Sequence, residues 1–151
     1  MKSQLEKYHL AMAGEYFVAA QLQRLRVAAS VTYGNAKKAD LLAFSATEDR
    51  VVRIEVKCTE KLEWVIGNEI PTPSSKPWVL VGLPPRTVEA PKFYVLTQEE
   101  LNKIIVSLPY WRDYEQRHGE PYPEDRAKVI KVGVKSVVSY ENKWDSVIQQ
   151  L

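Results

Sequence analysis

The sequence predicts a single α/β domain over residues 1–151, and three observations support this prediction. The chain has 151 residues, of which 45% are hydrophobic and 26% charged, a composition that is ordinary for one soluble globular domain. Residues 51–59, VVRIEVKCT, alternate between apolar and polar side chains as a half-buried β-strand does. A long segment near the N-terminus, roughly residues 3–26, consists mostly of good helix formers.

The first half of the chain predicts one helix followed by strands. We expect the helix to end near Arg24 and Arg26, where positive charge suits the helix dipole. Strand-like residues follow at 27–33. A β-hairpin comes next, with strands at 40–46 and 51–59 joined by the four-residue loop 47–50.

The second half is less regular. Residues 60–77 contain three prolines and are interpreted as irregular, whereas 78–83 and 93–96 are predicted strands. Thr97-Gln-Glu-Glu100 is a capping box that starts a helix to about Val106, and 107–125 predicts a short helix and a loop. We expect a last helix with Ser139 as a possible cap. Its predicted apolar stripe consists of Trp144, Val147, Ile148 and Leu151.

The polar face of the strand at 51–59 carries the main functional candidates, Glu55 and Lys57. If Ala46 pairs with Val51, then Asp40 lies opposite Lys57, and Leu42 lies opposite Glu55. Asp40 and Glu55 would then be diagonal neighbours on one face, with Cβ atoms about 7 Å apart. Two carboxylates at that separation can reach one divalent cation.

Glu15 is a third candidate because it lies within the apolar stripe of the predicted helix. The residues within about 60° of it are Tyr8, Ala11, Met12, Val18, Ala19 and Leu22. An ionised carboxylate without a partner costs several kcal/mol when buried, so Glu15 should be protonated, paired or near a cation. Gly14 weakens the helix by roughly 1 kcal/mol relative to alanine, which suggests that another backbone approaches there.

A glutamate and a lysine separated by one residue form a weak motif when taken alone. Glu141-Asn142-Lys143 is a second example in this chain, and it has neither an alternating strand nor a paired upstream acid. The informative pattern is the combination of Glu15 on a helix with Asp40, Glu55 and Lys57 on a hairpin.

The segments GEYFVAAQLQRL, KKADLLAF and RIEVKCT resemble the core of the PD-(D/E)xK nuclease superfamily, which includes restriction endonucleases and Holliday junction resolvases. The core motifs fall within residues 11–60. The pieces WVLVGL and KFYVLTQEEL are similar to small solitary members of the superfamily, which leaves about 97–151 as a C-terminal helical extension. The resemblance implies a restriction endonuclease-like core, a central mixed β-sheet flanked by helices. One departure is Ala39, which replaces the proline of the motif.

The resemblance also implies metal-dependent hydrolysis of DNA phosphodiesters by an endonuclease. Asp40 and Glu55 would be ligands of Mg²⁺ or Mn²⁺, and Lys57 would orient or activate water. Glu15 would support the metal or its waters as a third acid. The expected partner is duplex or branched DNA, and a symmetric homodimer would supply two sites for double-strand cleavage. An aromatic on the helix face opposite Glu15, Phe17, hints at a dimer contact.

Basic residues around the predicted site are candidates for binding phosphates. Lys37 and Lys38 directly precede Asp40 and are well placed to hold the nucleic-acid backbone. Arg24 and Arg26 belong to the same segment, 16–39, which contains no acid. Solvated surface side chains are the alternative interpretation of this cluster.

Two other interpretations remain open. The formal net charge of only +2 and a group of aromatics in the C-terminal region favour a catalytically silent nuclease-like domain that binds nucleic acid or a partner protein. These aromatics are Tyr110, Trp111 and Tyr114. In a third interpretation, Glu55 and Lys57 are a surface ion pair, and a buried partner satisfies Glu15.

Several classes of protein are disfavoured by the sequence. The single Cys58 excludes an internal disulfide, and with only His9 and His118 beside it no ligand set for structural zinc is present. We expect Cys58 to pack in the core and both histidines to be solvated. No apolar run approaches the roughly 20 residues of a membrane span, and MKSQLEKYHL lacks the order of a signal peptide. A cytoplasmic location is therefore expected.

Overall fold

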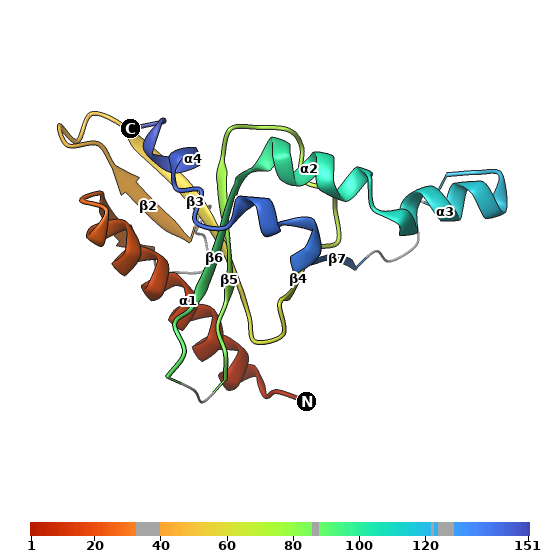
Figure 1. Cartoon of the computed structure of the whole chain (residues 1–151), viewed down its shortest axis with the longest axis horizontal. Helices are drawn as coiled ribbons and strands as arrows, with labels where there is room; N and C mark the ends of the chain where they lie inside the picture. The colour runs from red at the N-terminus through yellow and green to blue at the C-terminus, as the bar shows by residue number, and fades with distance from the viewer. Residues whose placement is uncertain (33–39, 86–87, 122, 124–128) are drawn as a thin grey trace.

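The molecule is built around a five-stranded mixed β-sheet. The computed structural model describes residues 1–32, 40–85, 88–121, 123 and 129–151, without the side chains of residues 110–112. The strand order is β1-β2-β3-β5-β6, in which β3 and β5 run parallel and the other neighbours are antiparallel. The strands are β1 (Ala28–Val31), β2 (Leu41–Phe44), β3 (Val51–Thr59), β5 (Pro77–Gly82) and β6 (Lys92–Thr97). Figure 1 shows this sheet with helices on either side, which confirms the predicted mixed sheet flanked by helices.

A smaller two-stranded sheet pairs β4 (Glu63–Gly67) with β7 (Ile130–Gly133). The interpretation of 60–77 as irregular was therefore wrong for β4, and β7 was not predicted. Both strands bury alternate residues against the rest of the protein, among them Trp64, which is 1% exposed. The indole Nε1 of Trp64 donates to the carbonyl of Val81 at 2.9 Å and ties the small sheet to β5.

The α-helices of the described chain are α1 (Gln4–Arg24), α2 (Gln98–Val106), α3 (Pro109–His118) and α4 (Asp145–Ile148). The predicted capping box of α2 is present, with Thr97 and Glu100 bonding each other's backbone N–H groups. In Figure 1, α3 projects away from the sheet. The predicted last helix over 139–151 was wrong in extent: a 3₁₀ turn occupies Val138–Tyr140, and only α4 is α-helical. Another 3₁₀ turn, Val134–Ser136, precedes this segment. The region 97–151 thus includes a strand and turns beside its helices.

Helix α1 has well-defined ends. At its start Ser3 and Glu6 form a capping box, a pattern that is readable in the sequence as S-x-x-E. At its end Arg26 has a φ of 63°, and its N–H bonds the Gln23 carbonyl, while the Val27 N–H bonds that of Leu22. This is a Schellman motif in which arginine occupies the left-handed position usually taken by glycine.

Two hydrophobic clusters cover the two faces of the sheet. The α1 face is packed by Val18, Leu22, Val27, Leu41, Ala43, Val52, Ile54, Val56, Val79, Val81, Phe93, Val95, Trp144 and Val147. The opposite face is packed by Trp64, Ile66, Trp78, Leu80, Tyr94, Leu96, Leu101, Ile105, Ile130, Val132 and Val137. Because β5 is buried on both faces, it forms the centre of the core.

Strand β3 changes its hydrogen-bonding partner half-way along its length. Residues 51–54 pair with β2 on one edge, and residues 55–59 pair in parallel with β5 on the other edge. The change falls between Ile54 and Glu55. Glu55 and Lys57 therefore lie where β3 leaves β2 and joins β5.

In the hairpin between β2 and β3, each residue pairs with a partner two residues away from the predicted one. Phe44 pairs with Val51 and Leu41 with Ile54, so the predicted pairs Ala46–Val51, Asp40–Lys57 and Leu42–Glu55 were wrong. A hydrogen bond from Ser45 N to Arg50 O closes the loop over 46–49. The Ser45 hydroxyl holds this turn because it accepts from Arg50 N at 3.0 Å and donates to Asp49 Oδ1 at 2.8 Å.

Helix α1 approaches β3 closely at Gly14. A Cβ placed on Gly14 would lie 2.6 Å from the Cβ of Cys58 and 2.9 Å from its Sγ, so only glycine fits without movement. This bears out the expectation that another chain segment approaches there. Burial, with the charge of Glu60 as a smaller cause, raises the pKa of the Cys58 thiol to about 12, which keeps it protonated in the packed interface.

Candidate functional site

Asp40 sits at the start of β2 and reaches the edge of β3. Its Oδ2 accepts a hydrogen bond from Val56 N at 2.9 Å. Its own N–H donates to Ile54 O at 3.1 Å, although Leu41 is the register partner of Ile54. Asp40, which directly precedes β2, is thus bound to β3 through both its backbone N–H and its side chain. The Asp40 carboxylate consequently lies beside the backbone between Glu55 and Lys57.

Glu55 and Lys57 share one face of β3. Their partners on β5 are Trp78 and Leu80, so both point to the face opposite α1. The two side chains are only partly buried, with exposed fractions of 22% for Glu55 and 35% for Lys57. Lys57 Nζ lies 3.9 Å from Glu55 Oε1, a loose ion pair that leaves the ammonium accessible.

Lys76 is a fourth member of the site, and the sequence did not predict it. Its Nζ lies 3.1 Å from Glu55 Oε2, closer than Lys57 comes to the other oxygen. Lys76 directly precedes β5 and stands two residues before Trp78, which places it on the same face as Glu55. No pattern in the sequence assigned Lys76 to a face of the sheet, because it ends a proline-containing segment. Only the parallel pairing of β3 with β5 gives it a position beside the acid.

Glu15 is buried, at 4% exposed, on the stripe of α1 that faces the sheet. This bears out its predicted burial. Val18 and Leu22, on the same stripe, pack on the α1 face, whereas Glu55 and Lys57 project from the opposite face. The structure therefore brings Asp40, Glu55 and Lys57 together along β3 but does not bring Glu15 onto their face.

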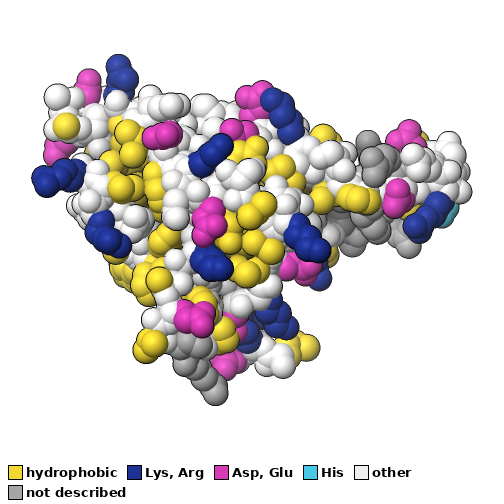
Figure 2. All heavy atoms as spheres, in the orientation of Figure 1, with side chains coloured by type: hydrophobic (Ala, Val, Ile, Leu, Met, Phe, Trp, Pro, Cys, Tyr) yellow, Lys and Arg dark blue, Asp and Glu magenta, His cyan; other side chains and the backbone are white. Residues whose placement is uncertain are grey.

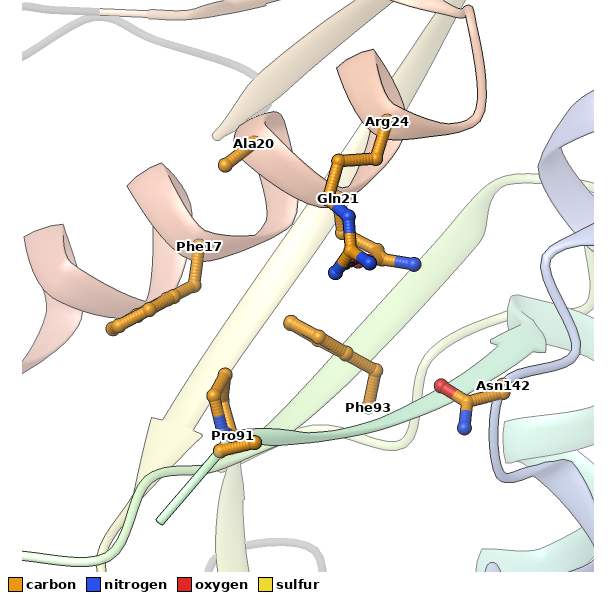
Figure 3. Close-up of a pocket in the computed structure, with 8 residues that line it drawn as sticks. Phe17, Ala20, Gln21, Arg24, Pro91, Phe93 and Asn142 are labelled. Carbon is orange, nitrogen blue, oxygen red and sulfur yellow. Dashed lines mark hydrogen bonds between the residues drawn. The ribbon is translucent and has the colours of Figure 1, made fainter. Parts of the chain in front are cut away.

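Arg24 and Arg26 lie at the C-terminal end of α1. Arg24 Nη1 donates to Gln21 Oε1 at 3.2 Å and lines a pocket of about 440 Å³ on the α1 side. Figure 3 shows Arg24 and Gln21 above Phe93, with Phe17 along the same wall. Phe17 is 41% exposed, as its position on the helix predicted.

Arg26 lines a separate depression near the β2–β3 loop, together with Asp49 and Arg50. Since Phe44 pairs with Val51, this depression lies at the end of β3 away from Glu55. Lys37 and Lys38 fall outside the described residues. His9 and His118 are exposed, in agreement with the prediction that they are solvated.

Charge on the surface is mixed in sign. In Figure 2 the Lys and Arg side chains are dispersed among Asp and Glu on the visible face and do not form one broad basic field. Any attraction for a polyanion from this face must therefore be local. In the parts of the chain that the structure describes, no helix is both long enough and apolar enough to cross a membrane.

The residues of the site fit a hard divalent cation in their donor chemistry. Mg²⁺ prefers oxygen ligands and is usually held by one or two carboxylates together with substrate phosphates and waters. Asp40 and Glu55 supply carboxylates on adjacent stretches of backbone. Among the described residues, no three His, Cys, Asp or Glu side chains are grouped closely enough to form a complete metal cluster. A bound ion would therefore need oxygens from substrate or water.

Comparison with known proteins gives a likeness of structure but none of sequence. No protein-family model matches the chain, and no curated protein matches it. Among solved structures, the chain is similar to a bacterial homing endonuclease, I-Ssp6803I, with a TM-score of 0.49 and 14% sequence identity. The likeness covers 99% of this chain and 94% of that one.

Proposed function

We propose that this chain is a metal-dependent endonuclease of the PD-(D/E)xK type that hydrolyses phosphodiester bonds of DNA. The observation that carries the proposal is the hydrogen bond from Val56 N to Asp40 Oδ2. It fixes the Asp40 carboxylate at the residue between Glu55 and Lys57. An aspartate, a glutamate and an accessible lysine therefore converge where β3 changes partner, although they come from two strands.

Asp40 and Glu55 would hold Mg²⁺ or Mn²⁺ through carboxylate oxygens. A bound ion of this kind stabilises the negative charge that develops on the phosphoryl group and lowers the pKa of a coordinated water. The protein's own task is to hold the two carboxylates in place. Asp40 is fixed by the backbone of β3, and Glu55 pairs with Lys76 when no metal is bound.

Lys57 would act on the attacking water and on the phosphate. Its side chain is 35% exposed and its ammonium is loosely paired, so it can donate a hydrogen bond to a water or to a non-bridging oxygen. In hydrolysis the water oxygen forms a bond to phosphorus, and the bond from phosphorus to the leaving oxygen breaks. A positive charge held near that phosphorus favours the transition state over the ground state.

The test is cleavage of supercoiled plasmid and of a synthetic four-way junction with Mg²⁺, Mn²⁺ or EDTA. We expect cutting that requires metal, and a fall of at least about 100-fold for Lys57→Ala and Asp40→Asn. Lys103→Ala is a matched control, because Lys103 also pairs with a glutamate, Glu99, but on the exposed surface of α2. Circular dichroism and a urea titration would establish that each variant is folded.

The possible outcomes separate the candidate functions. Full cleavage by a folded Lys57→Ala variant would show that the site is assigned wrongly. Calorimetry distinguishes an active enzyme from a silent nuclease-like domain, because the silent domain has no need to bind Mn²⁺. DNA affinity without metal binding or cleavage would favour the silent domain.

A further inference from the structure

We propose that Lys76 is a substrate-binding residue of this site, which holds the Glu55 carboxylate when substrate is absent and contacts a phosphate of the nucleic acid when it is bound. This inference rests on the proposed nuclease function and extends it to a residue outside the sequence motif. Among the described residues, the shortest ion-pair contact of Glu55 is with Lys76, at 3.1 Å, and not with the motif residue Lys57.

Lys76 ends the loop 71–76, and hydrogen bonds to the carbonyl groups of this loop hold its backbone in place. At the N-terminus of α2, the Gln98 N–H donates to Lys76 O at 2.8 Å, and the Glu99 N–H donates to Ser74 O at 2.9 Å. Three side-chain amides donate to further carbonyls of the loop, namely Gln98 to Thr72, Asn102 to Pro71, and Gln150 to Ser75. Donors from two distant parts of the chain therefore fix this loop.

Such anchoring fixes the backbone of Lys76 but places no restraint on the rotatable bonds of its side chain. The side chain is 28% exposed, and its ammonium is carried on four methylene groups, so it can move without any change in the loop. A fixed backbone and a long side chain with a charged end are suited to a residue that changes its binding partner. A lysine needed only to neutralise Glu55 would not require this support, since Lys57 already lies within 3.9 Å.

The charges of the site favour such a change of partner. Without metal, the carboxylates of Asp40 and Glu55 balance the ammonium groups of Lys57 and Lys76. A divalent cation on Glu55 would compete with Lys76 for the same oxygens and leave two positive charges in excess. A phosphodiester gains negative charge as water attacks, so the released ammonium has an anion to bind.

The experiment compares Lys76→Gln, Lys76→Arg and Lys103→Gln, each in the full chain. Mn²⁺ affinity is measured by calorimetry, and cleavage of the four-way junction is measured with Mg²⁺. Binding to the same junction is measured over a range of KCl concentrations in the Lys57→Ala background, so that the DNA stays intact. Urea denaturation of each variant monitors folding.

We expect Lys76→Gln to bind Mn²⁺ about 3- to 10-fold more tightly, because a competing cation is removed. DNA affinity should fall, and the slope of log K against log salt should decrease by about one, the value for one lost phosphate contact. Cleavage should slow by about 10-fold or more. Lys76→Arg should keep the wild-type slope, and Lys103→Gln should change none of these quantities.

Two results would overturn the inference. An unchanged salt slope in Lys76→Gln, with wild-type cleavage still metal-dependent, would remove Lys76 from substrate binding and leave the proposed function intact. Parallel losses of Mn²⁺ affinity, DNA affinity and stability would assign Lys76 a structural role only. If the wild-type protein neither binds Mn²⁺ nor cuts DNA, the proposed function fails, and the inference fails with it.

Discussion

Glu15 is the residue whose position most constrains the chemistry. It is 4% exposed and belongs to the face of the sheet opposite Glu55 and Lys57. A buried carboxylate that does not share a face with the other acids can act on them only through the edge of the sheet, where Asp40 directly precedes β2. We therefore expect Glu15 to support the site as a positioning residue.

The substitution Glu15→Gln tests this role because it removes the charge and keeps the shape. We expect Mn²⁺ affinity to fall by about 10-fold, in the range measured for residues that support metal ligands in other proteins. Cleavage at limiting Mg²⁺ should slow and recover at saturating Mg²⁺. Calorimetry and rates at several Mg²⁺ concentrations would measure both. The control is Glu115→Gln on the exposed surface of α3, and equal Mn²⁺ affinity in both variants would confine Glu15 to packing.

Single residues were predictable where their neighbours made a pattern. The alternation of VVRIEVKCT placed Glu55 and Lys57 on one face, and the helical stripe placed Glu15 in the interior; the structure agrees with both. Lys76 had no such pattern, because its position depends on the pairing of β5 with a strand about 20 residues earlier. Non-local pairing of this kind cannot be read from local periodicity.

At the scale of elements, the contact between α1 and β3 depends on Gly14. A methyl group there would overlap the Cβ of Cys58, which it would approach to 2.6 Å, so α1 would have to move away from the half of β3 that carries Lys57. We expect Gly14→Ala to destabilise the protein by about 1–3 kcal/mol, the usual cost of overpacking. The helix propensity of alanine offsets only about 1 kcal/mol of this.

Urea denaturation measures this effect, and Ala11→Gly provides the matched control. Ala11 is exposed on the same helix, so its replacement reports helix propensity without packing and should destabilise by about 1 kcal/mol. A more stable Gly14→Ala protein would contradict the tight contact between α1 and β3.

The elements also show why the predicted register of the hairpin was wrong by two residues. The prediction placed the loop at 47–50. In the structure the Ser45 hydroxyl bonds the N–H of Arg50 and the carboxylate of Asp49, and the loop closes one residue earlier. A hydroxyl that bonds the backbone in this way competes with strand pairing. The prediction of the last helix was wrong because Asn142, with a φ of 56°, interrupts the predicted segment.

At the scale of the whole molecule, the predicted DNA-binding arginines and the candidate site lie at different ends of β3. Four residues separate Val51, beside the Arg26 depression, from Glu55, or about 13 Å of extended strand. DNA that contacts both regions must follow the sheet over that length. The mixed surface charge in Figure 2 makes such local contacts more important than a general basic field.

We expect the double substitution Arg24→Gln with Arg26→Asn to weaken DNA binding by a factor that shrinks as salt rises. The salt slope should decrease by about two, while metal affinity stays at the wild-type value. Asparagine is chosen at position 26 because it tolerates the left-handed backbone found there, where φ is 63°. Fluorescence anisotropy at several KCl concentrations measures the slope, and an unchanged slope would exclude both arginines from the DNA contact.

The hydrogen bond from Gln150 to Ser75 has a consequence for how the protein acquires its site during synthesis. The loop that presents Lys76 is held partly by a side chain 75 residues further along the chain. Contacts of such long sequence separation form late in folding, because loop closure must precede them. A growing polypeptide whose residue 150 is still inside the ribosome would therefore carry Asp40, Glu55 and Lys57 without the complete anchoring of Lys76, and its site would be complete only after residue 150 has emerged.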